Sequence, residues 1–236
     1  VRTSSKSSAA RLQMLGVEKD RVKFIRRGLD HRTERKSFEV GEFGEPLNVV
    51  SVGRLVPKKG YFHQLEMASL LKERGIAFNW SIVGSGRLLK SLRAEISRKN
   101  LNDNMVLLGA RSEEEVREIF QNADAMVFTG IIDERGDRDG IPNVIPEAME
   151  AGCLLLGSIY AGASEAFVDG VSGFSLDPRD WEKWVDILDD FVDQPDQYIS
   201  IRKKGILHAR ENFDILKTAR GLLSAMEKAM NTNGNE

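Results

Sequence analysis

Residues 139–152 read Asp-Gly-Ile-Pro-Asn-Val-Ile-Pro-Glu-Ala-Met-Glu-Ala-Gly, and no other stretch of the chain says more about the fold. The Gly-x-Pro triplet near its start interrupts any preceding element. Asn143 is a suitable N-cap for a helix that runs to Gly152, because asparagine caps helix N-termini and glycine ends helices. The stretch therefore predicts a loop followed by a short helix. Asp139 stands before this helix, and Glu147 lies about one turn inside it.

The start of this helix has the properties of an anion site. Its first backbone N–H groups have no partner inside the helix, and they attract negative charge. Pro146 falls in the first turn, where a missing N–H costs little. Carboxylates before and inside the helix can accept hydrogen bonds from hydroxyls. A ligand that is anionic and carries hydroxyls on both sides, such as a nucleotide sugar, suits this layout.

Strand and helix patterns alternate through the middle of the chain. This alternation predicts an α/β fold, with a Rossmann-like parallel sheet flanked by helices and with further helices at the C-terminus. Ligands of such sheets bind beyond the carboxyl ends of the strands. The expected strands are 47–52, 77–83, 105–108, 125–129 and 153–157, and the expected helices are 61–74, 88–99, 113–121 and 143–152.

The two ends of the chain have a different pattern. A short helix over 8–15, a short strand over 22–25 and a charged loop over 31–46 are expected before the sheet. After the sheet, a helix capped by Asp180 should end at Pro195. Two more helices, 198–212 and 215–230, precede a tail that is predicted to be disordered.

Composition excludes several classes of protein. The 236 residues are 41% hydrophobic and 30% charged, with a formal net charge of −2, which gives no electrostatic argument for nucleic acid. The single cysteine, Cys153, cannot form an intrachain disulfide and is expected to be buried. No apolar run approaches the roughly 18 residues of a membrane span. The three histidines lack the spacing of metal ligands.

A second motif, which is basic, follows the first expected strand. Residues 53–60 read Gly-Arg-Leu-Val-Pro-Lys-Lys-Gly, and Arg54 and Lys59 would project from the carboxyl end of that strand. Two cations there can hold a diphosphate, the arginine through its fork and the lysine as a point charge. The alternative is a solvated basic turn.

Four further features follow, and three of them, the 84–86 turn, Arg111 and Glu165, allow two interpretations each. Gly84-Ser85-Gly86 is either a phosphate-binding turn or a tight turn. Arg111 can stack on a nucleotide base or remain solvated, and the charged stretch 130–138 is expected to be a solvated loop. Glu165 is expected to form a local ion pair or to cap the helix that follows it.

Both motifs resemble those of the family-four glycosyltransferases, which have the GT-B fold. The usual pattern is Glu-Gly-x-Pro, four variable residues and Glu-Ala-x-x-x-Gly, and this chain departs from it only in having Asp139 for the first glutamate. Residues 53–60 resemble the family's Gly-Arg-Leu-x-x-x-Lys-Gly element. The form of residues 136–144 is similar to that of enzymes of bacterial polysaccharide assembly.

The resemblance implies a domain organisation and a set of site residues. Residues 1–45 would be a linker from a missing N-terminal half, 46–212 the donor-binding domain, and 213–236 a C-terminal helix and tail. The implied catalytic residues are Arg54, Lys59 and Asp139. The implied donor-binding residues are Gly53, Gly84, Gly86, Arg111, Gly140, Ile141, Pro142, Asn143, Val144 and Glu147.

The resemblance also implies a reaction. The full enzyme would transfer a sugar, with retention, from a UDP- or GDP-sugar to a hydroxyl acceptor, without metal or other cofactor, and this domain alone would be weakly active or inactive. It would work in the cytoplasm, with the full protein able to associate peripherally with the inner face of the membrane, and its partner would be the missing N-terminal domain, in cis or in trans. The alternatives are a non-catalytic nucleotide-sugar-binding module and another GT-B-like activity such as epimerisation.

Overall fold

A computed structural model describes residues 1–30, 44–160 and 162–233 of the chain. The predicted loop over 31–46 lies mostly outside these residues, as does the end of the predicted disordered tail. The beginning of that tail is helical instead, because the last helix continues to Asn233.

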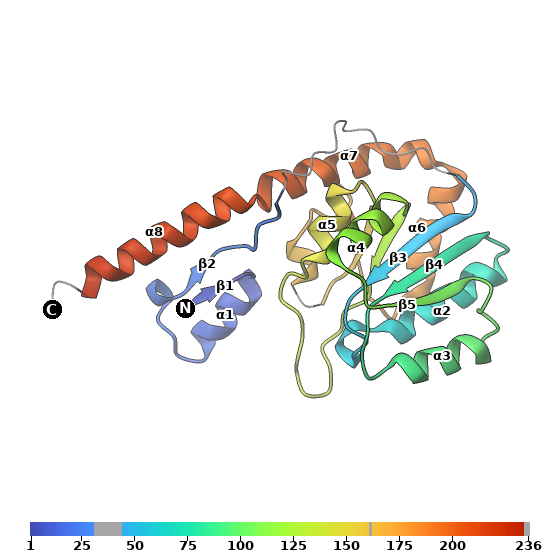
Figure 1. The fold of residues 1–236 in the computed structure, drawn as a ribbon, viewed down its shortest axis with the longest axis horizontal. Helices are drawn as coiled ribbons and strands as arrows, with labels where there is room; N and C mark the ends of the chain where they lie inside the picture. Colours follow the sequence, from blue (N-terminus) through green and yellow to red (C-terminus); the bar gives the residue numbers. More distant parts are fainter. Residues whose placement is uncertain (31–43, 161, 234–236) are drawn as a thin grey trace.

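A six-stranded parallel sheet organises the molecule (Figure 1). Its order is β5-β4-β3-β6-β7-β8, so the chain winds outward from β3 in one direction and then from β6 in the other. The crevice at the carboxyl ends of β3 and β6 is therefore the topological switch point, where ligands of doubly wound sheets bind. The strands are β3 (Leu47–Val52), β4 (Phe78–Val83), β5 (Met105–Gly109), β6 (Ala125–Phe128), β7 (Leu154–Ser158) and β8 (Phe174–Leu176).

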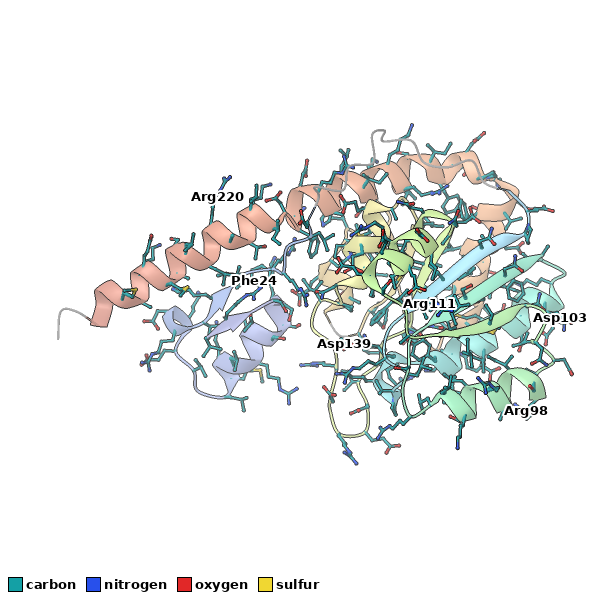
Figure 2. All side chains as sticks on the ribbon, in the orientation of Figure 1. Phe24, Arg98, Asp103, Arg111, Asp139 and Arg220 are labelled. Carbon is teal, nitrogen blue, oxygen red and sulfur yellow. The ribbon has the colours of Figure 1, made fainter. Side chains whose placement is uncertain are left out.

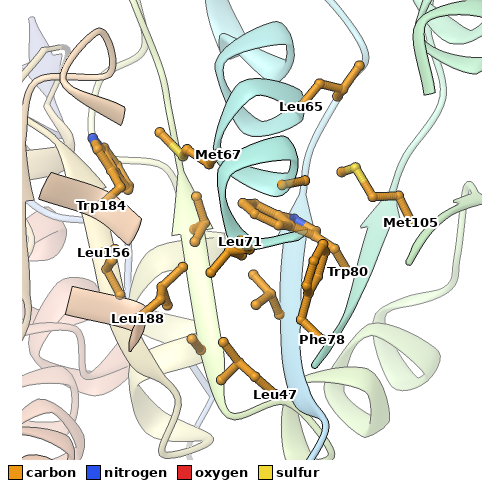
Figure 3. Close-up of a cluster of buried hydrophobic side chains, with 14 of the residues drawn as sticks. Leu47, Leu65, Met67, Leu71, Phe78, Trp80, Met105, Leu156, Trp184 and Leu188 are labelled. Carbon is orange, nitrogen blue, oxygen red and sulfur yellow. The ribbon is translucent and has the colours of Figure 1, made fainter. Parts of the chain in front are cut away.

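Helices cover both faces of this sheet, and each face has its own apolar cluster. One cluster joins the sheet to α2, α3 and α6, and it includes Trp80, Leu71 and Trp184 (Figure 3). The other joins it to α4, α5 and α7 through residues such as Phe120 and Met149. The helices are α2 (Tyr61–Glu73), α3 (Leu89–Arg98), α4 (Glu113–Gln121), α5 (Val144–Glu150), α6 (Trp181–Asp193), α7 (Pro195–Asn212) and α8 (Ile215–Asn233), with 3-10 turns η2 (Pro57–Lys59) and η3 (Ala163–Glu165).

The first 30 residues form a small unit beside the sheet (Figure 1). Strands β1 (Arg2–Thr3) and β2 (Lys23–Phe24) pair in parallel around α1 (Lys6–Met14) and η1 (Lys19–Arg21). The unit is tied to the C-terminal helices, since the Thr218 hydroxyl donates to the Arg26 carbonyl over 3.1 Å. The predicted helix and strand of this region are confirmed, while the two-residue β1 was not predicted.

The last helix continues beyond the sheet and passes the N-terminal unit (Figure 1). Leu216, Leu223 and Met226 of α8 are each more than half exposed. The helix that Asp180 begins was predicted to end at Pro195, and this is confirmed, because α6 ends at Asp193. Pro195 itself occupies the first turn of α7, where proline is tolerated. In the part of the chain that the structure describes, no helix is long and apolar enough to cross a membrane.

Candidate active site

The loop after β3 is shaped by close backbone contacts. A β-carbon on Gly60 would lie 2.0 Å from the Thr129 carbonyl oxygen, and Gly60 has a φ of 68°, so only glycine fits. The Thr129 hydroxyl donates to the carbonyl oxygens of Lys59 and Gly60, each over 3.1 Å. The Ile131 N–H donates to the Lys58 carbonyl over 2.8 Å. These contacts hold the loop after β3 against the loop after β6.

The same two loops bring two predicted site residues together. Lys59 Nζ lies 2.9 Å from Asp139 Oδ2, and both side chains are largely buried, 12% and 16% exposed. Lys59 Nζ also lies 4.8 Å from the centroid of the Phe128 ring, a cation–π contact. Figure 2 shows Asp139 on the side of the sheet domain that faces the N-terminal unit. The structure therefore joins the two motifs at the switch point.

Lys58 strengthens this cluster, although the sequence analysis gave it no role. Its Nζ lies 3.0 Å from Asp137 Oδ2 and 3.4 Å from Asp139 Oδ1. Burial opposes the charged form of Lys58, but the ion pairs outweigh it and raise the pKa of this lysine. The position next to Lys59 was the only sequence signal available for it.

Tyr61 is a second residue that the sequence analysis missed. Its hydroxyl donates to the Gly53 carbonyl over 2.9 Å, and its side chain is buried. Burial, and then the negative charge of Asp139, raise the pKa of this hydroxyl, so it stays protonated. This hydrogen bond from Tyr61 holds Gly53, the residue before Arg54, in place. As the first residue of α2, Tyr61 gave no sign of this role in the sequence.

Arg54 stands free at the open side of this cluster. Its side chain is exposed and makes no ion pair with any residue in the described ranges. It is close enough to Asp137 to help Lys58 lower the pKa of that carboxyl. An exposed guanidinium beside the Lys59–Asp139 pair is free to bind an incoming anion.

The Gly84-Ser85-Gly86 turn braces the Arg54 loop. A β-carbon on Gly84 would lie 1.9 Å from the Gly53 carbonyl oxygen, and one on Gly86 would lie 2.5 Å from that of Leu55. The Leu55 N–H donates to the Ser85 carbonyl over 2.9 Å. Both glycines are therefore required by close backbone approach, which favours the tight-turn interpretation.

Arg111 lies after β5 at the same edge of the sheet. Its side chain is 37% exposed, and Nε is 3.8 Å from a Glu115 carboxylate oxygen. Ser112 caps α4 in a reciprocal capping box with Glu115. Arg111 is thus solvated and loosely paired in this structure, with its guanidinium accessible to a ligand.

Residues 139–144 form the predicted loop and helix start. The Gly162 N–H donates to the Asp139 carbonyl over 3.0 Å, and a β-carbon on Gly162 would lie 2.6 Å from the Gly140 carbonyl carbon. Pro142 is buried and Ile141 is partly buried against the second core cluster. Asn143 occupies the N-cap position of α5, but its side chain caps nothing, since its backbone is already helical, with φ −61° and ψ −33°. The predicted side-chain cap is therefore wrong, while the helix itself is confirmed. Asp180 likewise caps α6 by position only.

Glu147 lies in a different environment from the Lys59–Asp139 pair. It is partly buried in a cavity of about 90 Å³ between α4, α5 and α7, whose lining includes Glu113, Arg117 and Arg210. Burial, and then the charge of Glu113, raise the pKa of Glu147. Within the described residues, no contact joins Glu147 to Arg54, Lys59 or Asp139. Two parts of the site are thus separate in the structure: Arg54 and Lys59 after β3, and the Glu147 carboxylate in the cavity beside α4.

Glu165 does not cap the element that follows it. Its two carboxylate oxygens accept the backbone N–H groups of Lys6 and Ser7, over 2.5 and 2.8 Å, at the start of α1. Its partner is far away in the sequence, which is why local reasoning missed it. In the described part of the chain, no group of three or more acidic, histidine or cysteine side chains could hold a metal ion.

The arrangement defines a class of protein. A doubly wound parallel sheet with helices on both faces is the Rossmann-like half of a GT-B fold. Residues 32–208 match the family model described as glycosyl transferases group 1, and the chain belongs to this family.

Relatives and solved structures agree with this assignment. The chain is 28% identical over 179 residues to the amylovoran biosynthesis glycosyltransferase AmsK of Erwinia amylovora, covering 75% of this chain and 44% of AmsK. It is 31% identical over 172 residues to WcaL of Escherichia coli (strain K12), whose name assigns it provisionally to colanic acid biosynthesis as a glycosyltransferase, covering 73% of this chain and 42% of WcaL. The chain therefore spans less than half the length of these relatives.

The structure of Anabaena HepE in complex with UDP has the same fold. It superimposes with a TM-score of 0.81 at 18% identity, covering 97% of this chain and 63% of HepE. HepE has also been solved with UDP-glucose, with the same TM-score and coverage. The predicted GT-B fold and family are thus confirmed.

Proposed function

We propose that this chain is the donor-binding half of a retaining glycosyltransferase that moves a sugar from a nucleotide sugar to a hydroxyl acceptor in polysaccharide or glycolipid synthesis. The observation that supports it most is the Lys59–Asp139 pair at the switch point, with Arg54 beside it. The solved HepE complexes favour UDP as the nucleotide. The names of AmsK and WcaL favour polysaccharide synthesis.

The chemistry assigns a task to each group. The bond between the anomeric carbon and the β-phosphate oxygen breaks, and the acceptor oxygen bonds to the anomeric carbon. Negative charge develops on the leaving diphosphate, whose β-phosphate oxygen takes the proton that the acceptor hydroxyl loses. Arg54 and Lys59 stabilise that charge, as cations do in preorganised sites. The backbone N–H groups near Asn143 and Val144 add to them.

The donor sugar and ribose occupy the two sides of this cluster. Asp139 accepts hydrogen bonds from the sugar hydroxyls, and Glu147 accepts them from the ribose. Gly53 and Gly140 let the backbone approach the ligand, while Gly84 and Gly86 support the Arg54 loop from the neighbouring turn. Ile141 and Pro142 shape the loop after β6, and Arg111 lies where the base would stack. The cations replace a metal, so the proposal requires none.

The whole enzyme needs an acceptor-binding half. Because this chain spans less than half the length of AmsK and WcaL, we propose that an N-terminal domain joins it in cis or in trans, and that the chain alone transfers sugar weakly or not at all. Work in the cytoplasm, at the inner face of the membrane, follows from the proposed role in polysaccharide assembly. The competing hypothesis, a non-catalytic nucleotide-sugar module, is favoured by the same short span.

Calorimetric titration tests the donor site. The chain is titrated with UDP, GDP and UDP-glucose in the presence of a chelator, together with the variants Arg54→Ala and Lys59→Ala. Arg93→Ala, an exposed arginine on α3, is the matched control. The proposal is supported if the wild-type chain binds one of these nucleotides and if both site variants bind it with an affinity lower by about tenfold or more, as the removal of a charged partner predicts. Equal affinity in all variants would contradict it, and binding without any transfer by the full-length protein would favour the non-catalytic module.

A further inference from the structure

A groove beside Asp139 has no role in the reaction described above. It has a volume of about 310 Å³, within the range of small-ligand pockets, and it lies between α1 and the loop after β6. Its lining residues are Ser8, Arg11, Arg135, Gly136, Asp137, Arg138 and Asp139.

The groove presents uncompensated positive charge. Its two acids are already paired, Asp137 with Lys58 and Asp139 with Lys59. Among the described residues, no carboxylate forms an ion pair with the three arginines of the lining. Three arginines line this one groove, and the guanidinium group of each can form a forked pair with a carboxylate or phosphate, so the lining is suited to an anion.

The loop that forms one wall has a defined shape. Asp133 Oδ1 accepts the backbone N–H groups of Arg135 and Asp137, over 3.0 and 2.9 Å. The Gly136 N–H donates to the Asp133 carbonyl over 2.8 Å, and Gly136 has a φ of 71°. This turn presents Arg135 and Arg138 on the two sides of one glycine.

The opposite wall is held against the sheet domain. Glu165 binds the N-terminus of α1, and Ser5 caps that helix by accepting the Ser8 N–H over 3.1 Å. Gly140 is so close to this helix start that a β-carbon on it would lie 3.5 Å from Ser4 Oγ. These contacts place the helix that carries Ser8 and Arg11 beside the loop that carries Asp139.

We propose that this groove binds the anionic group of a sugar substrate, a carboxylate or a phosphate. The inference rests on the proposed function, because Asp139 lines the groove and also forms the site for the donor sugar. The anion has two possible sources: a uronate on the donor sugar, or a carboxylate or phosphate on the acceptor. Both would place negative charge among Arg11, Arg135 and Arg138, in the groove that Asp139 also lines.

Two pairings of anionic with neutral ligands distinguish these sources, one for the donor and one for the acceptor, and the acceptor pairing has two anionic ligands. UDP-glucuronate is compared with UDP-glucose for the donor. For the acceptor, methyl glucuronoside and glucose 1-phosphate are compared with methyl glucoside, by NMR titration of the chain with and without UDP. The test variants are Arg11→Gln and the double variant Arg135→Gln/Arg138→Gln, and the control is Arg93→Gln.

The anionic ligand of one pair should bind more tightly than its neutral counterpart. Each arginine removed should weaken only that anionic ligand, by about two- to fivefold, as partly exposed ion pairs do. The difference in affinity between wild type and variant should become smaller as the salt concentration rises, and the control variant should bind every ligand as the wild type does. Equal binding of anionic and neutral ligands in both pairs, or an anionic preference that survives both variants, would overturn the proposal.

This outcome is separable from that of the donor site. Normal UDP binding with no anionic preference would remove the groove from the account and leave the donor site intact. Absence of UDP binding would count against the donor site, and the acceptor pair, measured without nucleotide, would still decide the groove.

Discussion

Replacing Asp139 by asparagine should strengthen UDP binding while it weakens the fold. In the free chain the Asp139 carboxylate neutralises Lys59 at 2.9 Å. A phosphate oxygen on the far side of the same ammonium group would lie about 5 Å from that carboxylate. At an effective dielectric constant of about 40 to 80, two such charges repel by roughly 0.8–1.7 kcal/mol. Removing the carboxylate should therefore raise the affinity for UDP by about 4- to 16-fold.

The effect on UDP-glucose should be smaller. If Asp139 accepts hydrogen bonds from the sugar, the asparagine variant gains affinity for the diphosphate and loses it for the sugar. The ratio of UDP-glucose to UDP affinity should thus fall. Without ligand the variant leaves Lys59 largely buried and unpaired, which should cost about 1–3 kcal/mol of unfolding free energy.

The assay is calorimetry with both ligands, together with thermal unfolding in the absence of ligand. Asp137→Asn is the matched control, because Asp137 pairs with Lys58 but is 59% exposed, and its UDP affinity should stay within about twofold. A loss of UDP affinity in Asp139→Asn, with Asp137→Asn unchanged, would refute the reasoning. It would mean that Asp139 positions Lys59 for the diphosphate rather than competing with it.

The remaining predictions concern the turn at Gly84, the carboxylate of Glu147 and the N-terminal unit. Gly84→Ala should lower the unfolding temperature and abolish UDP binding, because its β-carbon would lie 1.9 Å from the Gly53 carbonyl oxygen. The control is Gly75→Ala, which has open space around it; it should lower the free energy of unfolding by only about 1 kcal/mol and leave UDP binding intact. Glu147→Gln should raise thermal stability at pH 8 and lose that advantage as the pH falls through the raised pKa of Glu147, because protonation of the wild-type carboxyl then removes the same buried charge. The affinity of this variant for UDP should fall, since a hydrogen-bond acceptor for the ribose is lost. Equal melting curves of variant and wild type at pH 8 and below the raised pKa would contradict the stability prediction. Glu165→Ala should expose the start of α1 to faster hydrogen exchange, at a cost of about 1–2 kcal/mol, with exposed Glu134→Ala as control; unchanged exchange would show that Glu165 does not hold α1.

The sequence predicted most of the sheet domain, because its local patterns agree with the tertiary fold. The strand Leu47–Val52 and the helix Glu113–Gln121 were predicted with the bounds that the structure has. For the strand, a compact apolar run between turn residues was sufficient. For the helix, Ser112 and Glu115 form the capping box that marks its start. Where such signals exist, the element can be placed from sequence alone.

The parts that were missed depend on contacts between distant segments. Glu165 binds α1, and Tyr61 supports Gly53, and neither contact follows from local periodicity. Asn143 was expected to cap α5 through its side chain, but its helical backbone moves the side chain out of the capping position. The close approach of Gly84 to Gly53 likewise becomes visible only when β3 and β4 are paired.

The most direct test of the central claim is a crystal structure of this chain with UDP. The account predicts a diphosphate within hydrogen-bond distance of Arg54 and Lys59, at the carboxyl ends of β3 and β6, with the ribose hydroxyls near Glu147 and the base near Arg111. UDP bound elsewhere, with Lys59 and Asp139 still paired and Arg54 in solvent, would contradict it.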